Sequence, residues 1–319
     1  MPTSSGESRI TTHKSPGRDV RAALREGIAR LRTAGTPSHT LAAELLLMHV
    51  LGRERAWIYA HPEEPVDAGV EERYFELVAR RAAGVPTQYL TGKQEFWGLE
   101  FEVTSDVLIP RPETEHVVEV ALERIGPPNW EDEQAGRPRG SALRIADVGT
   151  GSGCLAIVLA HELPGAEIFA TDISEAALEV ARRNAERHGV AKRITFARCN
   201  LLDAFLHNSR LTNHESPLFD IIVSNPPYIA GKDAPALQRE VREHEPSAAL
   251  FAGPRGLDFY SPLVQQAEQL LKPGGALVLE LGYSSLRFVQ PLLEGPAWTS
   301  SRVTNDLAGI PRVLSAART

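Results

Sequence analysis

The chain has 319 residues and a formal net charge of -7. This length suits one large domain and a smaller one, and the acidic balance argues against a protein that binds nucleic acid stably through its phosphates. No apolar run is long enough for a membrane span, and Cys154 and Cys199 look like small buried residues in a reducing compartment, so we expect a cytoplasmic protein without a disulfide or a metal site.

Residues 1–18 are rich in Ser, Thr and Gly and have no apolar core. This composition predicts a disordered tail; a transit peptide is the alternative, although no amphipathic pattern supports it. Apolar residues then recur with a helical period, and the pattern is interrupted at Pro37, at Gly52 and between Pro62 and Pro65. We therefore expect a small helical domain over residues 19–92.

A β-hairpin is expected to link this domain to the rest of the chain over residues 93–110. We predict the hairpin from the mixed alternation of five apolar residues, Phe96, Leu99, Phe101, Val103 and Val107. A catalytic domain should then occupy residues 111–319. Its segment 126–143 is rich in Pro, Gly and charge and should form an exposed loop.

A glycine-rich turn follows the short apolar run at residues 144–148 and precedes a helical pattern. A strand, turn and helix of this kind bring backbone close to a nucleotide and aim helix N–H groups at it. The spacing is G-x-G-x-G, with Cys154 where a dinucleotide-binding turn has its third glycine, which favours a cofactor without a pyrophosphate. Cofactor binding is assigned to Gly149, Thr150, Gly151, Ser152 and Gly153.

Asp172 ends a second apolar run, at residues 167–171. An acidic side chain in this position accepts hydrogen bonds from ribose hydroxyls. Asp172 and Ser174 also suit the N-cap of the helix expected over residues 175–188, and the two roles are compatible. A nucleoside that carries an electrophilic methyl group satisfies these two constraints and also that of residues 225–228, described next, so S-adenosylmethionine is the predicted cofactor.

The segment Asn225-Pro226-Pro227-Tyr228 follows the apolar run at residues 219–223. Neither proline has a backbone N–H, and both disfavour helical geometry in the preceding residue, so the segment should stay extended with free carbonyls. The Asn225 side-chain oxygen and the Pro226 carbonyl then suit the two hydrogens of a planar NH2 group, and Tyr228 offers a face for stacking. We predict methylation of a planar nitrogen, with Asn225 and Pro226 catalytic and all four residues binding the substrate. The alternative is that the two prolines merely end a strand.

Strands and helices continue to alternate toward the carboxyl end. The expected strands lie at residues 193–200, 219–225, 276–281, 300–305 and 312–316, and the expected helices at 260–271 and 284–293. Such alternation implies an α/β fold with a mostly parallel sheet that binds ligands at the carboxyl ends of its strands. The glycine turn, Asp172 and Asn225 all lie at those ends, so they should form one site.

Other charged residues are open to two interpretations. Arg111 and Glu113 either line a substrate channel or fix the linker. Glu280 lies inside a strand, where it faces the cofactor edge or, as we expect, pairs with a neighbouring Arg. The mixed charges at residues 239–245 indicate a solvated helix face.

The catalytic half resembles the class I S-adenosylmethionine-dependent methyltransferases, and its NPPY segment is similar to that of members that methylate amino or amide nitrogen. Over roughly residues 20–319 the chain is similar to the HemK family, the release-factor glutamine methyltransferases. Beyond NPPY, the segments that carry this resemblance are Gln88-Tyr89-Leu90-Thr91-Gly92, Glu95-Phe96-Trp97-Gly98-Leu99, Ile109-Pro110-Arg111-Pro112-Glu113-Thr114-Glu115 and Asp306-Leu307-Ala308-Gly309.

The resemblance implies a Rossmann-like, seven-stranded sheet and an N-terminal helical domain that grips a protein substrate. It implies methyl transfer to the side-chain N5 of the glutamine in the GGQ loop of class 1 peptide-chain release factors, the expected partners. Asn225 would then border the cofactor as well as the glutamine. Family members usually carry an adenine-binding acid near the end of the third strand; the matching residue is Asn200, followed by Leu201, and Asp203 is the alternative. The segment at residues 206–217 is longer than is typical of the family.

Three rival functions remain. An adenine or cytosine N-methyltransferase would need a basic groove or a target-recognition domain, which the acidic balance disfavours. A methyltransferase for another translation protein would differ in the surface of its helical domain. A binding protein without activity would not need the glycine, acidic and NPPY elements together.

Overall fold

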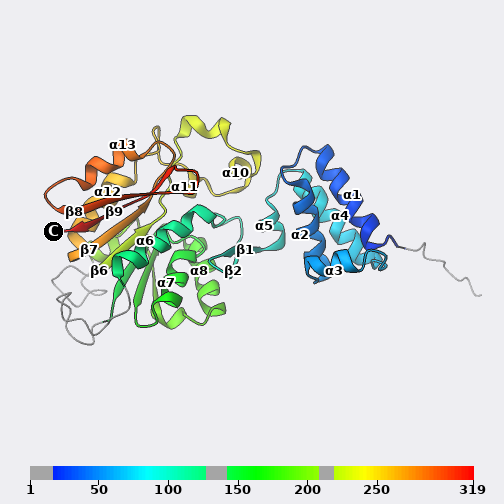
Figure 1. The fold of residues 1–319 in the computed structure, drawn as a ribbon, viewed down its shortest axis with the longest axis horizontal. Helices are drawn as coiled ribbons and strands as arrows, with labels where there is room; N and C mark the ends of the chain where they lie inside the picture. The colour runs from blue at the N-terminus through cyan, green and yellow to red at the C-terminus, as the bar shows by residue number, and fades with distance from the viewer. Residues whose placement is uncertain (1–16, 127–141, 208–218) are drawn as a thin grey trace, which may run out of the picture. The chain divides into compact units, whose positions relative to one another are not determined.

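The structure is a computed structural model that describes residues 17–126, 142–207 and 219–319 (Figure 1). The tail expected at residues 1–18 therefore lies outside the described residues except for its last two positions. Most of the loop at 126–143 and of the segment at 206–217 also lies outside them. Contacts divide the chain into two compact units, Met1–Thr91 and Gly92–Thr319.

The first unit is a helical bundle around a core in which Tyr74 is fully buried. The side chains of Asp19 and Asp67 accept backbone N–H groups in the first turns of two of its helices, as N-cap residues do. The three longer helices confirm the predicted helical pattern, whereas the two short ones were not predicted. The helices are α1 (Val20–Thr33), α2 (His39–Leu51), α3 (Arg55–Ala60), α4 (Ala68–Ala82) and α5 (Thr87–Thr91).

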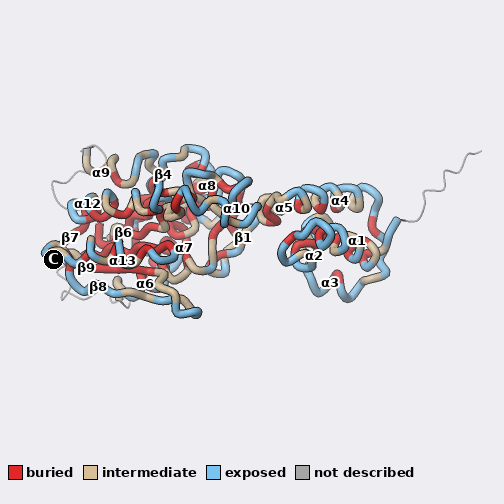
Figure 2. Tube along the Cα trace, turned by 90° about the horizontal axis from the view of Figure 1, so that it is seen from above, coloured by how far each residue is buried: buried red, intermediate tan, exposed pale blue. Residues whose placement is uncertain are grey.

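The second unit is an α/β/α sandwich around a seven-stranded sheet with the order β5-β4-β3-β6-β7-β9-β8. The strands β3 to β7 are parallel, and only β9 and its neighbours pair antiparallel, which confirms the predicted mostly parallel sheet. Helices α6, α7 and α8 cover one face, and α9, α12 and α13 cover the other. Figure 2 shows the buried residues concentrated along the central strands.

The strands of this sheet are β3 (Arg144–Val148), β4 (Glu167–Asp172), β5 (Ile194–Arg198), β6 (Phe219–Ser224), β7 (Leu271–Glu280), β8 (Trp298–Asn305) and β9 (Pro311–Arg318). The α-helices are α6 (Glu115–Ile125), α7 (Cys154–Glu162), α8 (Glu175–Arg187), α9 (Asp203–His207), α10 (Arg239–His244), α11 (Ser247–Leu250), α12 (Tyr260–Leu270) and α13 (Leu286–Val289). The 3-10 segments are η1 (Pro112–Thr114), η3 (Ala191–Arg193), η4 (Gly231–Ala236) and η5 (Gln290–Leu293).

Strand β7 and the helix expected over residues 284–293 differ from the sequence prediction. Strand β7 begins at Leu271, ahead of a Pro-Gly-Gly stretch that looked like a turn, because its pairing with β6 has an irregular register that accommodates the extra residues. The helix expected over residues 284–293 is split into α13 and η5. Ser284 has a φ of 66°, outside the helical region, and Pro291 lacks the N–H that a continuous helix would use.

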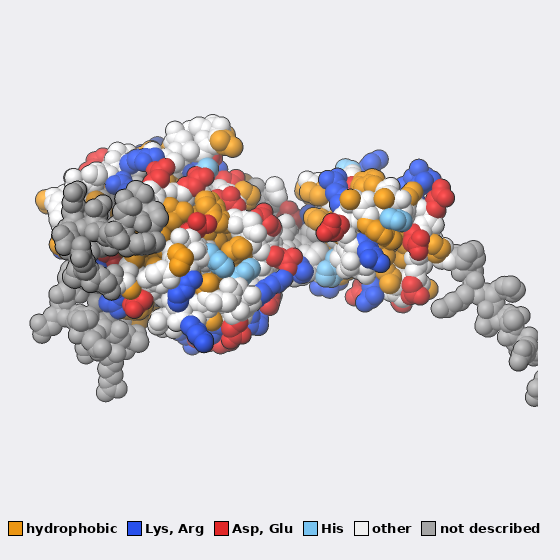
Figure 3. All heavy atoms as spheres, turned by 60° about the horizontal axis from the view of Figure 1, so that its bottom comes forward, with side chains coloured by type: hydrophobic (Ala, Val, Ile, Leu, Met, Phe, Trp, Pro, Cys, Tyr) orange, Lys and Arg blue, Asp and Glu red, His pale blue; other side chains and the backbone are white. Residues whose placement is uncertain are grey.

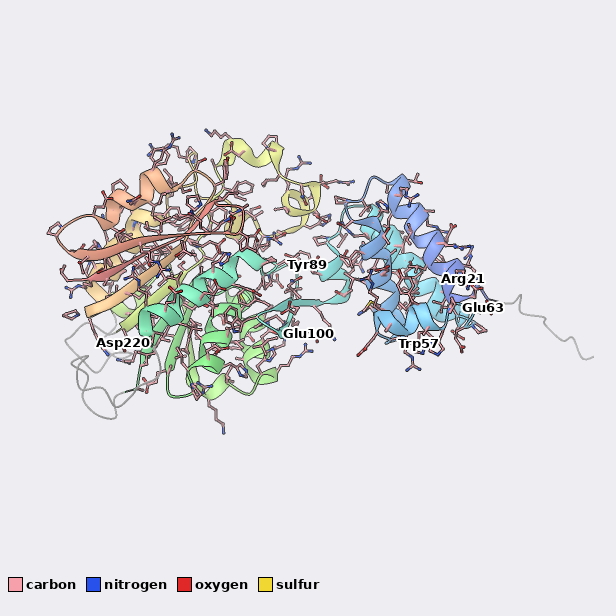
Figure 4. All side chains as sticks on the ribbon, viewed as in Figure 1. Arg21, Trp57, Glu63, Tyr89, Glu100 and Asp220 are labelled. Carbon is pink, nitrogen blue, oxygen red and sulfur yellow. The ribbon has the colours of Figure 1, made fainter. Side chains whose placement is uncertain are left out.

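A hairpin of β1 (Lys93–Phe96) and β2 (Leu99–Glu102) belongs to the second unit. It is attached through Asn184 of α8, whose side chain is fully buried. The Asn184 Oδ1 accepts the Glu102 N–H at 2.7 Å, and its Nδ2 donates to the carbonyls of Glu102 at 3.0 Å and Ser152 at 2.9 Å. Glu100 of β2, labelled in Figure 4, adds an ion pair with Arg187. One amide thus connects the hairpin to the glycine turn.

The opposite, amino-terminal edge of the sheet is fixed by Asp220, also labelled in Figure 4. Its carboxylate accepts the Arg144 N–H at 2.8 Å and pairs with Lys272 Nζ at 3.0 Å. Three neighbouring strands are therefore joined at that edge. Their carboxyl ends lie at the other edge.

Candidate active site

The predicted site residues follow strands that end side by side. In the sheet register, Val148 at the end of β3 pairs with Thr171 of β4 on one side and with Ser224 of β6 on the other. The chain leaves β3 toward β4 and later returns to β6, so this edge is the switch point at which α/β sheets bind ligands. The glycine turn, Asp172 and Asn225 therefore lie at one edge.

The glycine turn presents bare backbone at this edge. The N–H groups of Gly149 and Thr150 both donate to the Thr171 carbonyl, at 2.9 and 2.8 Å. Gly149 and Gly151 have φ values of 73° and 55°, and a Cβ added at either would meet nothing within 4 Å. Only glycine adopts this conformation without strain, and the space beside it is open to a ligand.

Asp147 of β3 is fully buried next to the glycine turn and binds it through its side chain. Its Oδ2 accepts the Thr150 hydroxyl at 2.6 Å and the Ala156 N–H at 3.1 Å, and burial raises its pKa to about 7. Since Ala156 lies in the first turn of α7, Asp147 occupies part of the helix terminus that a pyrophosphate would need. The arrangement is consistent with a cofactor that lacks one.

Asp172 holds the other side of the turn. Its Oδ2 accepts the Gly151 N–H at 3.0 Å and its Oδ1 accepts the Ser174 N–H at 2.9 Å, while burial raises the pKa of the carboxyl. The N-cap of α8 is Ser174, whose hydroxyl accepts the Ala177 N–H at 3.2 Å. Each Asp172 oxygen keeps a further lone pair, so both can still accept a hydroxyl.

Beyond β5 the two candidate adenine contacts differ. Asn200 is exposed, and its side chain forms no hydrogen bond with the described residues. Asp203 is engaged, because its Oδ1 accepts Gln266 Nε2 of α12 at 2.7 Å. Leu201 has a φ of 49°, an uncommon conformation for a residue with a branched side chain. These contacts favour Asn200 over Asp203 as the residue free to meet a ligand.

The NPPY segment is extended and leaves β6 without forming a helix. Asn225 Nδ2 donates to Thr114 Oγ1 at 3.0 Å. Within the described part of the chain, neither Asn225 Oδ1 nor the Pro226 carbonyl accepts a hydrogen bond. Pro226 is buried, whereas Asn225, Pro227 and Tyr228 are half-buried.

Glu280, at the end of β7, is fully buried beside this segment. It accepts the Thr114 hydroxyl at 2.7 Å and the Tyr228 hydroxyl at 3.2 Å, and burial raises its pKa to about 7. The expected pairing with an Arg was wrong, because Arg312 forms its ion pair with Asp306, at 2.8 Å. The Tyr228 ring packs against Gly282, where an added Cβ would lie 2.8 Å from the ring.

Curated relatives match the chain over almost its whole length. A release factor glutamine methyltransferase of Koribacter versatilis is 41% identical over 92% of this chain and 97% of its own length. Those of Bradyrhizobium diazoefficiens (41%) and Moorella thermoacetica (42%) each cover 94% of this chain, and 95% and 98% of their own lengths. The chain belongs to the release factor glutamine methyltransferase family.

Both units also match known domain families. The family described as the PrmC N-terminal domain matches residues 22–92, and a methyltransferase domain family matches residues 139–300. Among solved structures, the catalytic domain of hMettl16 in complex with MAT2A 3′UTR hairpin 6 has a TM-score of 0.52 and 18% identity. It covers 76% of this chain and 81% of that chain, a likeness that shows the fold alone.

In this family member, Arg111 fixes the segment before η1 to the segment after NPPY. Its guanidinium pairs with Glu245 at 2.5 Å. Glu245 is buried, so the prediction of a solvated face fails at the end of residues 239–245, although α10 itself carries exposed ion pairs. Burial raises the pKa of Glu245. The ion pair with Glu245 therefore favours the interpretation in which Arg111 fixes the linker over the one in which it lines a substrate channel.

Thr114 and Asp147 are two buried residues of this site for which the sequence predicted no role. Thr114 was named only within the motif at residues 109–115, and Asp147 lies within the apolar run at residues 144–148. For Asp147 a signal did exist, because it is an acidic residue inside an apolar run. Thr114 lies between Glu113 and Glu115, and its local sequence does not distinguish it from these neighbours. Nothing in the spacing indicated which partners they would meet.

Proposed function

We propose that this member of the release factor glutamine methyltransferase family takes its methyl group from S-adenosylmethionine and transfers it to the side-chain N5 of the glutamine in the GGQ loop of class 1 peptide-chain release factors. Methylation of a release-factor glutamine follows from the family. One observation above all supports the choice of an amide acceptor: Asn225 donates through its NH2 group to Thr114, which leaves its oxygen for a substrate at the sheet edge that also carries Asp172.

The residues around the glycine turn suit the proposed cofactor. Asp172 keeps acceptor capacity for two ribose hydroxyls, and the open space beside Gly149 and Gly151 admits a nucleoside against bare backbone. Asn200 can accept from the adenine amino group, with Leu201 beside it. When bound, S-adenosylmethionine would supply a methyl group activated by a neighbouring sulfonium.

The chemical task of the chain is to turn a delocalised amide into a nucleophile. Asn225 Oδ1 and the Pro226 carbonyl would accept the two N–H groups of the glutamine and hold its nitrogen in line with the methyl group. Catalysis then comes from orientation and from acceptors that favour the charge developing on nitrogen. The nitrogen loses its proton after it has gained the methyl group, to water or to one of these acceptors. No strong base is needed.

The helical unit is the proposed contact surface for the release factor. Its exposed apolar side chains include Leu41 and Tyr59. On the face drawn in Figure 3, Lys and Arg side chains are interspersed with Asp and Glu side chains over the described residues. This distribution suits a protein partner better than a nucleic-acid backbone. Among the described residues, no helix has the length and apolar character that crossing a membrane requires.

The test is a transfer assay with S-adenosylmethionine labelled in its methyl group. The acceptors are a class 1 release factor, its variant with alanine in place of the GGQ glutamine, and an RNA and a duplex DNA at moderate salt. Label is expected in the first acceptor alone, and mass spectrometry should locate it on the glutamine. Label that persists in the alanine variant, or that appears on nucleic acid at the same rate, would overturn the proposal.

A further inference from the structure

A single buried carboxylate connects both ends of the NPPY segment to distant parts of the chain. Glu280 accepts the Tyr228 hydroxyl through Oε1 and the Thr114 hydroxyl through Oε2. Thr114 Oγ1 in turn receives Asn225 Nδ2 at 3.0 Å. Thr114 is 2% exposed and Glu280 1% exposed, so water does not compete for these bonds. The network joins η1, the end of β6 and the end of β7.

The available protons determine which atoms of this network donate hydrogen bonds and which accept them. An ionised Glu280 can only accept, so the one hydroxyl proton of Thr114 must point at Glu280. The remaining lone pairs of Thr114 Oγ1 can only accept, and they select the NH2 end of the Asn225 amide. A flipped amide would set Oδ1 against Thr114 Oγ1 with no hydrogen between them. It would also turn an NH2 group toward the substrate, where the glutamine presents NH2 as well.

We propose that Thr114 and Glu280 are positioning residues for methyl transfer, a buried hydroxyl and carboxylate that fix the orientation of the Asn225 amide so that its oxygen faces the acceptor glutamine. The inference rests on the proposed function and deepens it. Neither residue touches the reacting atoms. Both act through Asn225, and Glu280 also anchors Tyr228 at the other end of the segment.

The test compares three variants in steady-state transfer to the release factor at pH 8. Thr114→Val keeps the shape of the side chain and removes the hydroxyl, so the Asn225 amide loses its orienting partner. Its kcat should fall about 10- to 100-fold, the factor expected for one misdirected buried hydrogen bond. Thr114→Ser keeps the hydroxyl and should recover kcat to within about threefold of the wild type. Calorimetric affinity for S-adenosylmethionine should change little in either variant.

Glu280→Gln gives an independent measurement if the valine variant folds poorly. A glutamine can turn its own NH2 group toward Thr114, which frees the Thr114 proton for Asn225 Oδ1, so kcat should fall although every side chain keeps its shape. A wild-type kcat in Glu280→Gln, or equal losses in Thr114→Val and Thr114→Ser, would overturn the inference. If the wild type itself transfers no label to the release factor, the proposed function fails and the inference falls with it.

Discussion

At the scale of single residues, the site has to solve the problem of a weak nucleophile. An amide nitrogen shares its lone pair with the carbonyl, so a methyl donor alone does not make it react. Two acceptors on the NH2 group restrict its rotation and favour the cationic nitrogen, and Asn225 is the side chain able to supply one of them. Its own NH2 group is already bound by Thr114 at 3.0 Å.

Replacing Asn225 with alanine should therefore lower kcat by about 100-fold, as loss of a preorganised polar group commonly does. The affinity for S-adenosylmethionine should change by less than about threefold, since the glycine turn and Asp172 keep their contacts. Steady-state kinetics and calorimetry measure the two quantities separately. Losses of similar size in both would contradict the catalytic role of Asn225.

Asp172 should behave in the opposite way. Asp172→Ala removes the acceptors proposed for the ribose and also frees the N–H groups of Gly151 and Ser174. Affinity for the cofactor should fall about 10- to 100-fold, which corresponds to one or two lost charge-assisted hydrogen bonds. kcat at saturating cofactor should fall far less. A calorimetric titration with unchanged affinity would count against the ribose contact.

At the scale of elements, the sequence predicts which segments become strands and which edge carries the site. Apolar runs of strand length, a glycine turn and a proline pair are local signals, and β3, β4 and β6 lie where those signals put them. The contacts between elements were not predictable in the same way. The Thr114 bonds to Asn225 and Glu280 span 111 and 166 positions, and no periodicity encodes which polar residues meet across such distances.

The packing of α1 against α4 offers a test of one element pair. Gly27 lies on α1 where an added Cβ would be 1.9 Å from the Tyr74 hydroxyl oxygen. Tyr74 is fully buried and cannot swing aside. Gly27→Ala should therefore destabilise the helical unit by about 1–3 kcal/mol, the usual effect of overpacking a core. Thermal unfolding measured by circular dichroism detects this loss.

Gly165→Ala is the matched control, because a Cβ added there meets nothing within 4 Å. It should leave stability unchanged or raise it by up to about 1 kcal/mol, since alanine restricts the unfolded chain. Equal melting temperatures for the two variants would show that Tyr74 does not confine Gly27.

At the scale of the whole molecule, the functional edge places several carboxyl groups in the protein interior. Burial raises the pKa of Asp147 and of Glu280 to about 7, and it raises those of Asp172 and Glu245 as well. Ionisation of these groups costs more in the folded than in the unfolded chain. Burial of these carboxyl groups therefore lowers the free energy of unfolding at neutral pH. Functional sites often lower stability in this way.

The sign of this effect can be tested at Glu280. Below about pH 4 the carboxyl is protonated in both states; between about pH 4 and 7 the unfolded chain ionises first and binds fewer protons, so stability falls as pH rises. Above the folded pKa of about 7 the effect is complete. Glutamine does not titrate, so the melting temperature of Glu280→Gln minus that of the wild type should rise from pH 5 to pH 8. The sign of this pH dependence follows from the difference in bound protons between the folded and the unfolded chain, so it does not depend on which hydrogen bonds the substitution alters. A difference that falls over the same range would mean that Thr114, Tyr228 and Arg312 stabilise the carboxylate more than burial penalises it.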